Sequence, residues 1–102
     1  MAREIVIAVK KEGEPWERLV VEDNLKVYQG IVEGNIECCY RTVSNMLIFG
    51  NEEGRIRGMK PNVATPEGTI VGPVFAVRSG TGGEFDSLKK KDLKMLGVNV
   101  SS

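Results

Sequence analysis

Residues 4–9 read Glu4-Ile-Val-Ile-Ala-Val9, and this stretch decides the fold class. β-Branched residues occur at both even and odd positions, which is typical of a strand buried on both faces. The segment 11–15, Lys-Glu-Gly-Glu-Pro, has the composition of a turn. A second strand is predicted over 16–21, so the chain begins with a hairpin whose first strand is central in a sheet.

A helix is predicted over residues 24–33. We expect Asp23 to cap its start and Gly34 to close its end, because these residue types satisfy the free backbone groups of helix termini. Gly30 falls inside the helix, where glycine is unfavourable, and a close approach to the sheet would explain it. The apolar residues that recur at helical spacing are Leu25, Tyr28 and Val32.

After this helix, β-forming residues dominate the expected strands between residues 35 and 78. The prolines in 60–68 predict a loop there, and Asn51-Glu-Glu-Gly54 predicts a tight turn. Gly72-Pro73 indicates a bulge or an edge position within the last long strand. The strands expected in this part of the chain cover 35–43, 45–49, 55–59 and 69–78.

A final helix is predicted to begin at Asp86 or Ser87 and to end near Leu96, with 98–102 as a frayed tail. The strands do not alternate regularly with helices. We therefore expect one α+β domain over residues 1–102, with a mainly antiparallel sheet of about six strands and two helices packed on one face.

The charge is balanced, with 14 basic and 14 acidic residues. A dedicated nucleic-acid binder usually carries a basic excess, so the composition argues against that class. The apolar run before Lys10 is too short for a membrane span or a signal peptide. We expect a cytoplasmic protein that does not contact membranes.

Histidine is absent, which excludes Ser-His-Asp and Cys-His catalysis and the ordinary zinc sites. Cys38 and Cys39 are adjacent, so a disulfide framework is not possible and a reducing compartment is expected. On a strand the two thiols point to opposite faces, one into the core and one to the surface. The sequence predicts neither an enzyme nor a bound cofactor or metal.

Two motifs have both a chemical and a structural interpretation. Glu52 and Glu53 could hold Mg²⁺ for phosphoryl chemistry, but a polar turn that keeps a hairpin soluble is favoured. The loop with Gly80, Gly82 and Gly83 departs in spacing from phosphate-binding motifs, so a mobile connector is favoured.

Glu52 and Glu53 are also candidates for partner binding, together with two further features. Lys89, Lys90, Lys91 and Lys94 concentrate positive charge at the start of the last helix, where the helix dipole disfavours it. An anionic partner would relieve this, although an ordinary solvated face is the alternative. Trp16 is either an exposed interface anchor or a partly buried core residue, and packing is favoured.

Three blocks resemble one protein family in their order and spacing. They are Leu25-Lys-Val-Tyr-Gln-Gly-Ile-Val-Glu-Gly-Asn-Ile-Glu37, Asn51-Glu-Glu-Gly-Arg-Ile-Arg-Gly-Met-Lys-Pro-Asn62, and Ile70-Val-Gly-Pro-Val-Phe-Ala-Val77 running to Phe85-Asp-Ser-Leu88. The chain resembles domain of unknown function 3846, which is found in phages and bacterial mobile elements. It departs from the family pattern at Lys89-Lys90-Lys91, where a Thr/Glu-rich start is expected. The family supplies no catalytic residues.

The resemblance implies an accessory protein that blocks a host-defence system by binding. A type II CRISPR effector nuclease is the first candidate partner, which would make the chain an anti-CRISPR protein. Acidic groups could imitate phosphates in its nucleic-acid channel, although neutral net charge favours steric occlusion by a mixed surface. Those acidic groups are Glu12, Glu14, Glu17, Glu22 and Asp23.

Two alternatives remain open. The lysines of the last helix predict a nucleic-acid-binding accessory protein, whose affinity would fall steeply with salt. Glu52 and Glu53 predict a metal-dependent nuclease. The residues do not assign an oligomeric state.

Overall fold

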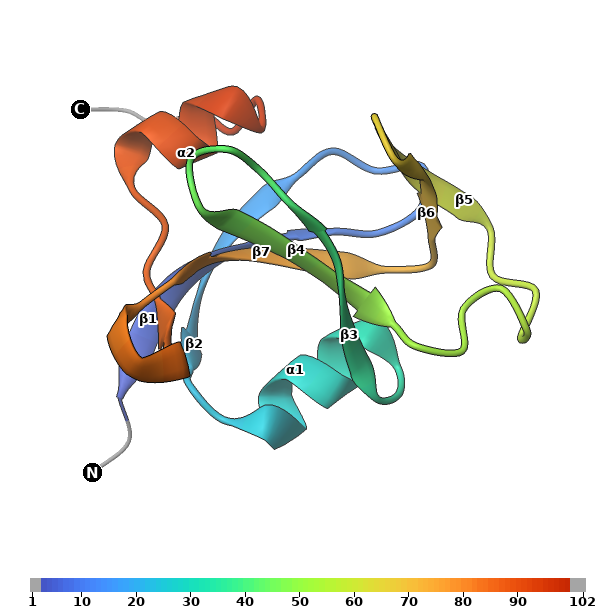
Figure 1. The fold of residues 1–102 in the computed structure, drawn as a ribbon, viewed down its shortest axis with the longest axis horizontal. Coiled ribbons are helices and arrows are strands. Elements are labelled where there is room, and N and C mark those ends of the chain that lie inside the picture. The colour runs from blue at the N-terminus through green and yellow to red at the C-terminus, as the bar shows by residue number, and fades with distance from the viewer. Residues whose placement is uncertain (1–2, 100–102) are drawn as a thin grey trace.

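The computed structural model describes residues 3–99, and its main sheet is centred on β7 (Val74–Ser79). The strand order is β2-β1-β7-β4-β3, β8 pairs with β7, and every pairing is antiparallel. The α+β prediction, with a mainly antiparallel sheet and two helices, is confirmed (Figure 1). The other strands of this sheet are β1 (Glu4–Lys10), β2 (Glu17–Glu22), β3 (Ile36–Arg41), β4 (Met46–Asn51) and β8 (Phe85–Asp86).

The predicted N-terminal hairpin is present, since β1 and β2 pair from Glu4 opposite Glu22 to Val9 opposite Glu17. β1 also pairs with β7 and is therefore internal to the sheet, as its apolar sequence predicts.

Both faces of the sheet are buried, and each is covered by a different helix. Side chains alternate along β7, so Phe75 and Val77 join the cluster on one face while Val74 and Ala76 join the cluster on the other. The helix α1 (Leu25–Val32) packs on the first face. The second face is covered by Leu93 of the helix α2 (Lys90–Met95).

The prediction that both helices pack on one face is therefore wrong. The connection from β8 to α2 crosses to the other side of the sheet, where the backbone N–H of Leu88 donates to the carbonyl of Val6 at 2.9 Å. Figure 1 shows α1 below the sheet and α2 above it.

A second sheet contains β5 (Pro61–Thr65) and β6 (Gly68–Val71), where a loop over 60–68 was predicted. The prolines do not prevent it, because Pro61 is the first residue of β5 and Pro66 lies in the two-residue turn. This hairpin adds Ile70 to the core of the second face.

The predicted strand over 69–78 is two strands that belong to different sheets. Gly72 has φ +80° and separates β6 from β7. A side chain there would be strained, and its Cβ would also lie 2.5 Å from the sulfur of Met59. Glycine therefore forms a corner between two strands at this position, where a bulge or an edge position within one strand was predicted.

The predicted strand over 55–59 is also absent, and residues 52–58 form a series of turns. The alternation in Arg55-Ile56-Arg57 suggests a strand, but local hydrogen bonds take up the backbone. The N–H of Arg57 donates to Glu53 O at 2.8 Å, and the N–H of Gly58, which has φ +71°, donates to Arg55 O at 3.1 Å.

The helix α1 is present as predicted, but different residues cap it. Asn24, not Asp23, accepts from the N–H of Val27 at 3.0 Å. Glu33 takes the left-handed conformation, with φ 65°, that was expected of Gly34. Gly30 does not approach the sheet closely, because no atom lies within 4 Å of the place its Cβ would take.

The last helix begins later than predicted, with Lys89 as its N-cap residue. The backbone N–H of Lys89 donates to Asp92 Oδ2 at 2.7 Å. Val98, predicted to belong to a frayed tail, packs against the core of the second face. Residues 100–102 of that predicted tail lie outside the described range.

Candidate interaction surfaces

Residues 52–58 form a surface turn that is fixed to the body of the protein through Asn51. The buried side chain of Asn51 donates to the carbonyls of Val32 and Glu33 at the end of α1, both at 3.1 Å. Its Oδ1 accepts from the N–H of Glu53 at 2.7 Å, and its carbonyl accepts from Gly54 at 3.1 Å. One amide therefore connects the turn, the helix end and β4.

Two arginines hold the turn from either side. Arg57 donates to the carbonyl of Glu33 at 2.7 Å, and Arg55 donates to the carbonyl of Thr69 in β6 at 2.8 Å. Hydrogen bonds from a charged donor are stronger than neutral ones. Between them lies Ile56, whose side chain is 86% exposed. The turn thus presents an apolar residue to solvent on a braced backbone.

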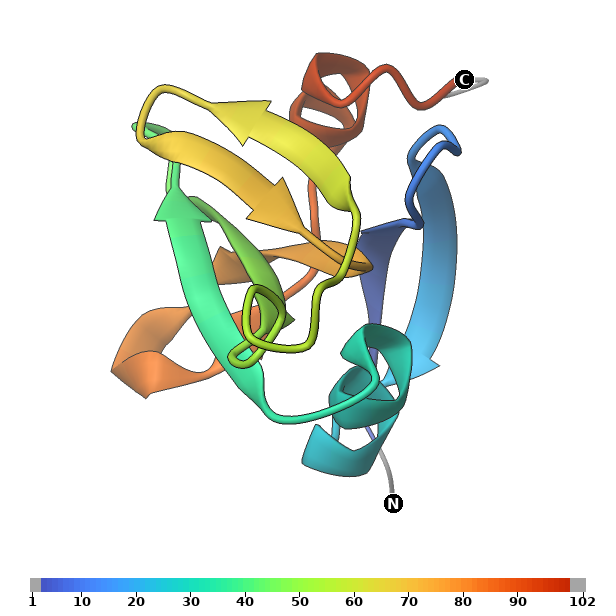
Figure 2. The same ribbon diagram turned by 90° about the vertical axis from the view of Figure 1, so that its right-hand side faces the viewer.

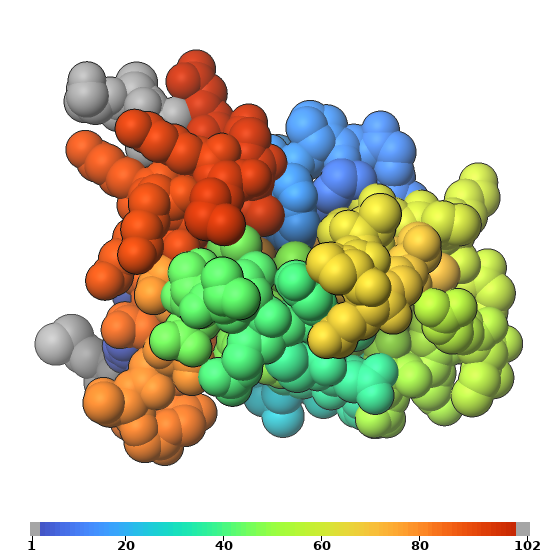
Figure 3. Space-filling view, turned by 45° about the horizontal axis from the view of Figure 1, so that its top comes forward, coloured from blue at the N-terminus to red at the C-terminus, as the bar shows by residue number. Residues whose placement is uncertain are grey.

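A hollow of about 340 Å³ lies between this turn, β3 and β6. Its lining includes Glu37, Glu52 and Glu67, with Arg55 and Ile56 on the side of the turn. The segments that form β3 and the β5–β6 hairpin lie next to each other on the face shown in Figure 3. Acidic groups and one exposed isoleucine thus border the same surface depression.

The two thiols lie beside this hollow and differ in burial, as predicted. Cys38 is exposed, whereas Cys39 is partly buried and packs against the core of the second face. A register shift between Cys38 and Tyr40 marks a bulge in β3 at this point. Burial, with a smaller contribution from Glu37, raises the pKa of the Cys39 thiol and disfavours its reactive thiolate form.

Glu52 and Glu53 both lie in the turn and are exposed. The carboxylate of Glu52 accepts from the side-chain amide of Asn35 at 2.9 Å. Within residues 3–99, no three Cys, Asp or Glu side chains lie close enough together to hold a metal ion. Glu52 and Glu53 thus occupy exposed positions in a polar turn.

The four lysines Lys89, Lys90, Lys91 and Lys94 are all exposed around the start of α2. No ion pair involves them in the part of the chain that the structure describes. Asp92 in the same turn is fully buried and places a negative charge at the helix start, which offsets the unfavourable lysines. Met95, in the same helix, is 61% exposed and does not belong to the core.

The remaining candidates do not gather into one site. Trp16 is partly buried and packs against the core of the second face, which agrees with the packing interpretation. Gly80 leads into a short 3-10 turn, η1 (Thr81–Gly83), that connects β7 to β8. Of the acidic groups on the first hairpin, Glu14, Glu17 and Glu22 are exposed, while Glu12 and Asp23 are partly buried.

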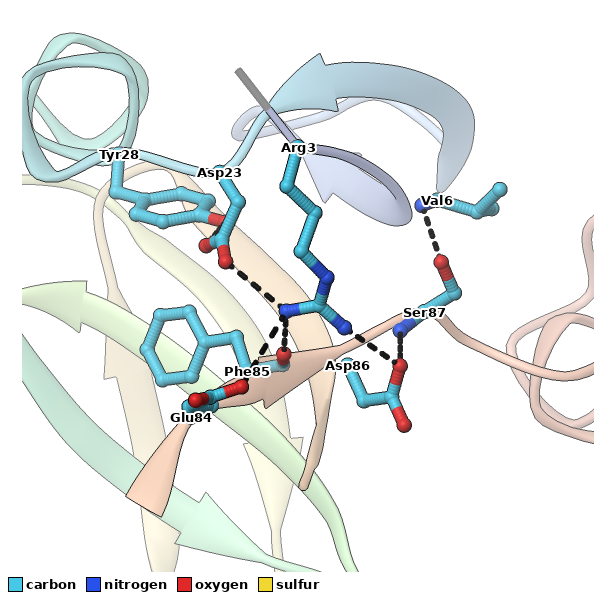
Figure 4. A network of polar contacts seen from close by, with 8 residues as sticks. All are labelled: Arg3, Val6, Asp23, Tyr28, Glu84, Phe85, Asp86 and Ser87. Carbon is cyan, nitrogen blue, oxygen red and sulfur yellow. Dashed lines mark hydrogen bonds and ion pairs between the residues drawn. The ribbon is translucent and has the colours of Figure 1, made fainter. Parts of the chain in front are cut away.

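A polar network around Arg3 was not predicted from the sequence. Its guanidinium donates to Asp23 at 3.2 Å, to the carbonyl of Phe85 at 2.8 Å and to Asp86 at 3.1 Å (Figure 4). The hydroxyl of Tyr28 donates to Asp23 at 2.6 Å. The network joins β1, α1 and β8 and has a structural role, since these groups satisfy one another.

The family model described as Domain of unknown function (DUF3846) matches residues 3–99. No curated protein and no solved structure matches the chain. None of the helices within residues 3–99 is long and apolar enough to cross a membrane.

Proposed function

We propose that this chain, which belongs to the DUF3846 family, is a phage or mobile-element accessory protein that inhibits a host-defence system by binding. The first candidate partner is a type II CRISPR effector nuclease, which would make the chain an anti-CRISPR protein. In this proposal the turn over residues 52–58 is the contact surface, and inhibition is by steric occlusion.

The exposure of Ile56 on a braced turn is the observation that carries the proposal. Burying an isoleucine side chain contributes about 1.5–3 kcal/mol, which an exposed residue gains only from a partner. Because Arg55 and Arg57 already hold the turn in place, little conformational entropy is lost on binding. These are the properties of an interface anchor.

The charge around the turn supports a nuclease as the partner. Three glutamates, Glu37, Glu52 and Glu67, and one arginine, Arg55, line the hollow beside Ile56, so its lining is net acidic. Enzymes that handle nucleic acids carry basic channels, and complementary charge speeds encounter and fixes orientation. The occurrence of the family in phages and mobile elements is the reason for choosing a nuclease of a host-defence system.

The test is co-purification followed by a cleavage assay. The tagged protein is expressed in a bacterium with a type II CRISPR system, and bound protein and nucleic acid are both identified. A stoichiometric effector is expected, and guide RNA in the complex would place the blocked step after guide loading. An effector that loads its guide and cuts DNA normally with excess protein present would remove the proposal.

A nucleic-acid-binding accessory role is the second candidate, because the lysines of α2 are exposed and not involved in any described ion pair. It predicts binding of RNA or DNA whose affinity falls steeply with salt. The double variant Lys90→Glu with Lys94→Glu should abolish that binding, and an unchanged affinity would count against this role.

A further inference from the structure

The outer edge of β2 is an open strand edge. β2 ends the main sheet, and its pairing with β1 runs from Glu17 to Glu22 without a bulge. Figure 2 shows this strand in light blue at the border of the molecule, with no other element on its outer side. It contains no proline, and Val20 in its centre is 51% exposed. Natural edge strands usually carry a device that prevents pairing with another chain, and β2 has the charged residues Glu17, Arg18 and Glu22 but no proline or bulge.

The backbone groups that face outward follow from the register. The N–H of Asp23 donates to the carbonyl of Arg3 at 2.7 Å, so these two residues form a hydrogen-bonded pair. Bonded and non-bonded pairs alternate in an antiparallel ladder. The backbone N–H and C=O groups of Arg18, Val20 and Glu22 therefore point away from β1, toward the open edge, where the carbonyl of Glu22 also accepts from the N–H of Asn24 at 2.9 Å.

This edge is complementary to itself. When a second copy is laid antiparallel with Val20 opposite Val20, Arg18 of each copy lies opposite Glu22 of the other. All three positions have outward backbone groups, so they meet as hydrogen-bonded pairs. On the other side of the strand, Leu19 meets Val21, and both already pack against the core of the first face.

The charges within one copy favour this arrangement. Glu22 lies directly opposite Glu4 in β1, where like charges repel, and its carboxylate accepts from the side-chain amide of Asn24 at 2.7 Å. Arg18 lies opposite Ala8 and has no charged partner across the ladder. Pairing about Val20 would place each Arg18 opposite a Glu22 of the other copy. The repulsion between Glu4 and Glu22 would then be offset once in each copy.

We propose that two copies of this chain associate through β2, antiparallel about a two-fold axis at Val20, so that their main sheets become continuous. The exposed valines meet at the centre, and two Arg18–Glu22 pairs flank them. Interfaces with two-fold symmetry require such a self-complementary surface. The dimer does not depend on the partner of the Ile56 turn, which lies on a different part of the fold.

The first test is the mass in solution, measured by light scattering after size exclusion over a range of concentrations. We expect twice the 11.2 kDa of one chain. Arg18→Glu and Glu22→Arg should each raise the dissociation constant roughly tenfold or more, since each places like charges opposite one another. The double variant Arg18→Glu with Glu22→Arg should restore the dimer.

The second test is hydrogen exchange, which does not rely on charge. The amides of Arg18, Val20 and Glu22 should be protected in the wild type and exchange rapidly in either single variant. Melting curves show whether each variant is folded. A monomer at all concentrations, or a dimer that both single variants retain with these amides unprotected, overturns the proposal.

Discussion

Arg78 in β7 and Asp92 in α2 form the only ion pair with a fully buried member within residues 3–99. Arg78 Nη1 lies 2.8 and 2.9 Å from the two carboxylate oxygens of Asp92, and its Nη2 donates to Ser44 O at 2.8 Å. Asp92 also accepts from the backbone of Lys89. This pair fixes the position of α2 on the sheet and connects it to the turn before β4.

Asp92→Ala is predicted to destabilise the protein by about 3–5 kcal/mol, because it leaves the Arg78 guanidinium largely buried without its partner. Urea denaturation measures the change in the free energy of unfolding. Lys94→Ala, on the exposed side of the same helix, is the control and should change it by less than about 0.5 kcal/mol. Equal effects of the two substitutions would show that the pair does not hold α2.

Gly30, inside α1, and Gly34, just after its C-cap residue, should respond oppositely to alanine. Gly30→Ala should stabilise the protein by about 0.5–1 kcal/mol, since glycine is unfavourable inside a helix and the added methyl group meets no atom within 4 Å. At Gly34 the added Cβ would lie 2.5 Å from the side-chain nitrogen of Asn51. Gly34→Ala should therefore destabilise, because it displaces the amide that holds the turn.

Chemical denaturation of both variants measures whether the free energy of unfolding rises for Gly30→Ala and falls for Gly34→Ala. Stabilisation by Gly34→Ala would mean that Asn51 moves without cost and that the turn over residues 52–58 is not fixed by it. The exposed fraction of Ile56 would then not reflect a rigid presentation.

The sequence predicts best those elements whose signals are local. β1, β2 and α1 follow from β-branched runs and helical spacing within one short window. The tight turn over 51–54 was predicted, but residues 55–59 were predicted as a strand, because the groups that brace this part of the turn are distant in sequence. Arg55 bonds to Thr69 and Arg57 to Glu33, and neither contact leaves a pattern in the residues between them.

The candidate sites show the same limit. The lysines of α2 are visible as a charge run, and their exposure follows from it. The burial of Asp92 among them does not, because its partner Arg78 comes from another strand. Strand pairing also decides which side of β2 is open, so the complementarity of Arg18 and Glu22 becomes readable only once the register is known.

Stability should depend on the ionisation of Tyr28 at alkaline pH. Burial, and then the hydrogen bond to Asp23, raise the pKa of the Tyr28 phenol above its ordinary value of about 10. The folded state thus favours the protonated phenol. Its contribution to stability is complete below pH 10 and is lost as the pH rises from there through the raised pKa.

Tyr28→Phe tests this dependence, because it removes the ionisable group and keeps the ring that stacks on Phe75. The free energy of unfolding of the wild type should fall more steeply above pH 10 than that of the variant. Tyr40→Phe is the control for a phenol outside this network. If the free energy of unfolding falls with pH equally in the wild type and in Tyr28→Phe, the ionisation of Tyr28 is not the cause of the fall.

Ile56→Asp is the substitution that separates binding by the turn from folding. Ile56 is 86% exposed and its neighbours Arg55 and Arg57 keep their backbone partners, so the free energy of unfolding should change by less than about 0.5 kcal/mol. If the turn is the contact surface for the defence nuclease, affinity and inhibition should fall at least tenfold or so, as for an interface anchor. Val43→Asp is the matched control, because Val43 is fully exposed and lies in the turn between β3 and β4. Loss of inhibition by Val43→Asp with full activity of Ile56→Asp would move the contact surface to that other turn.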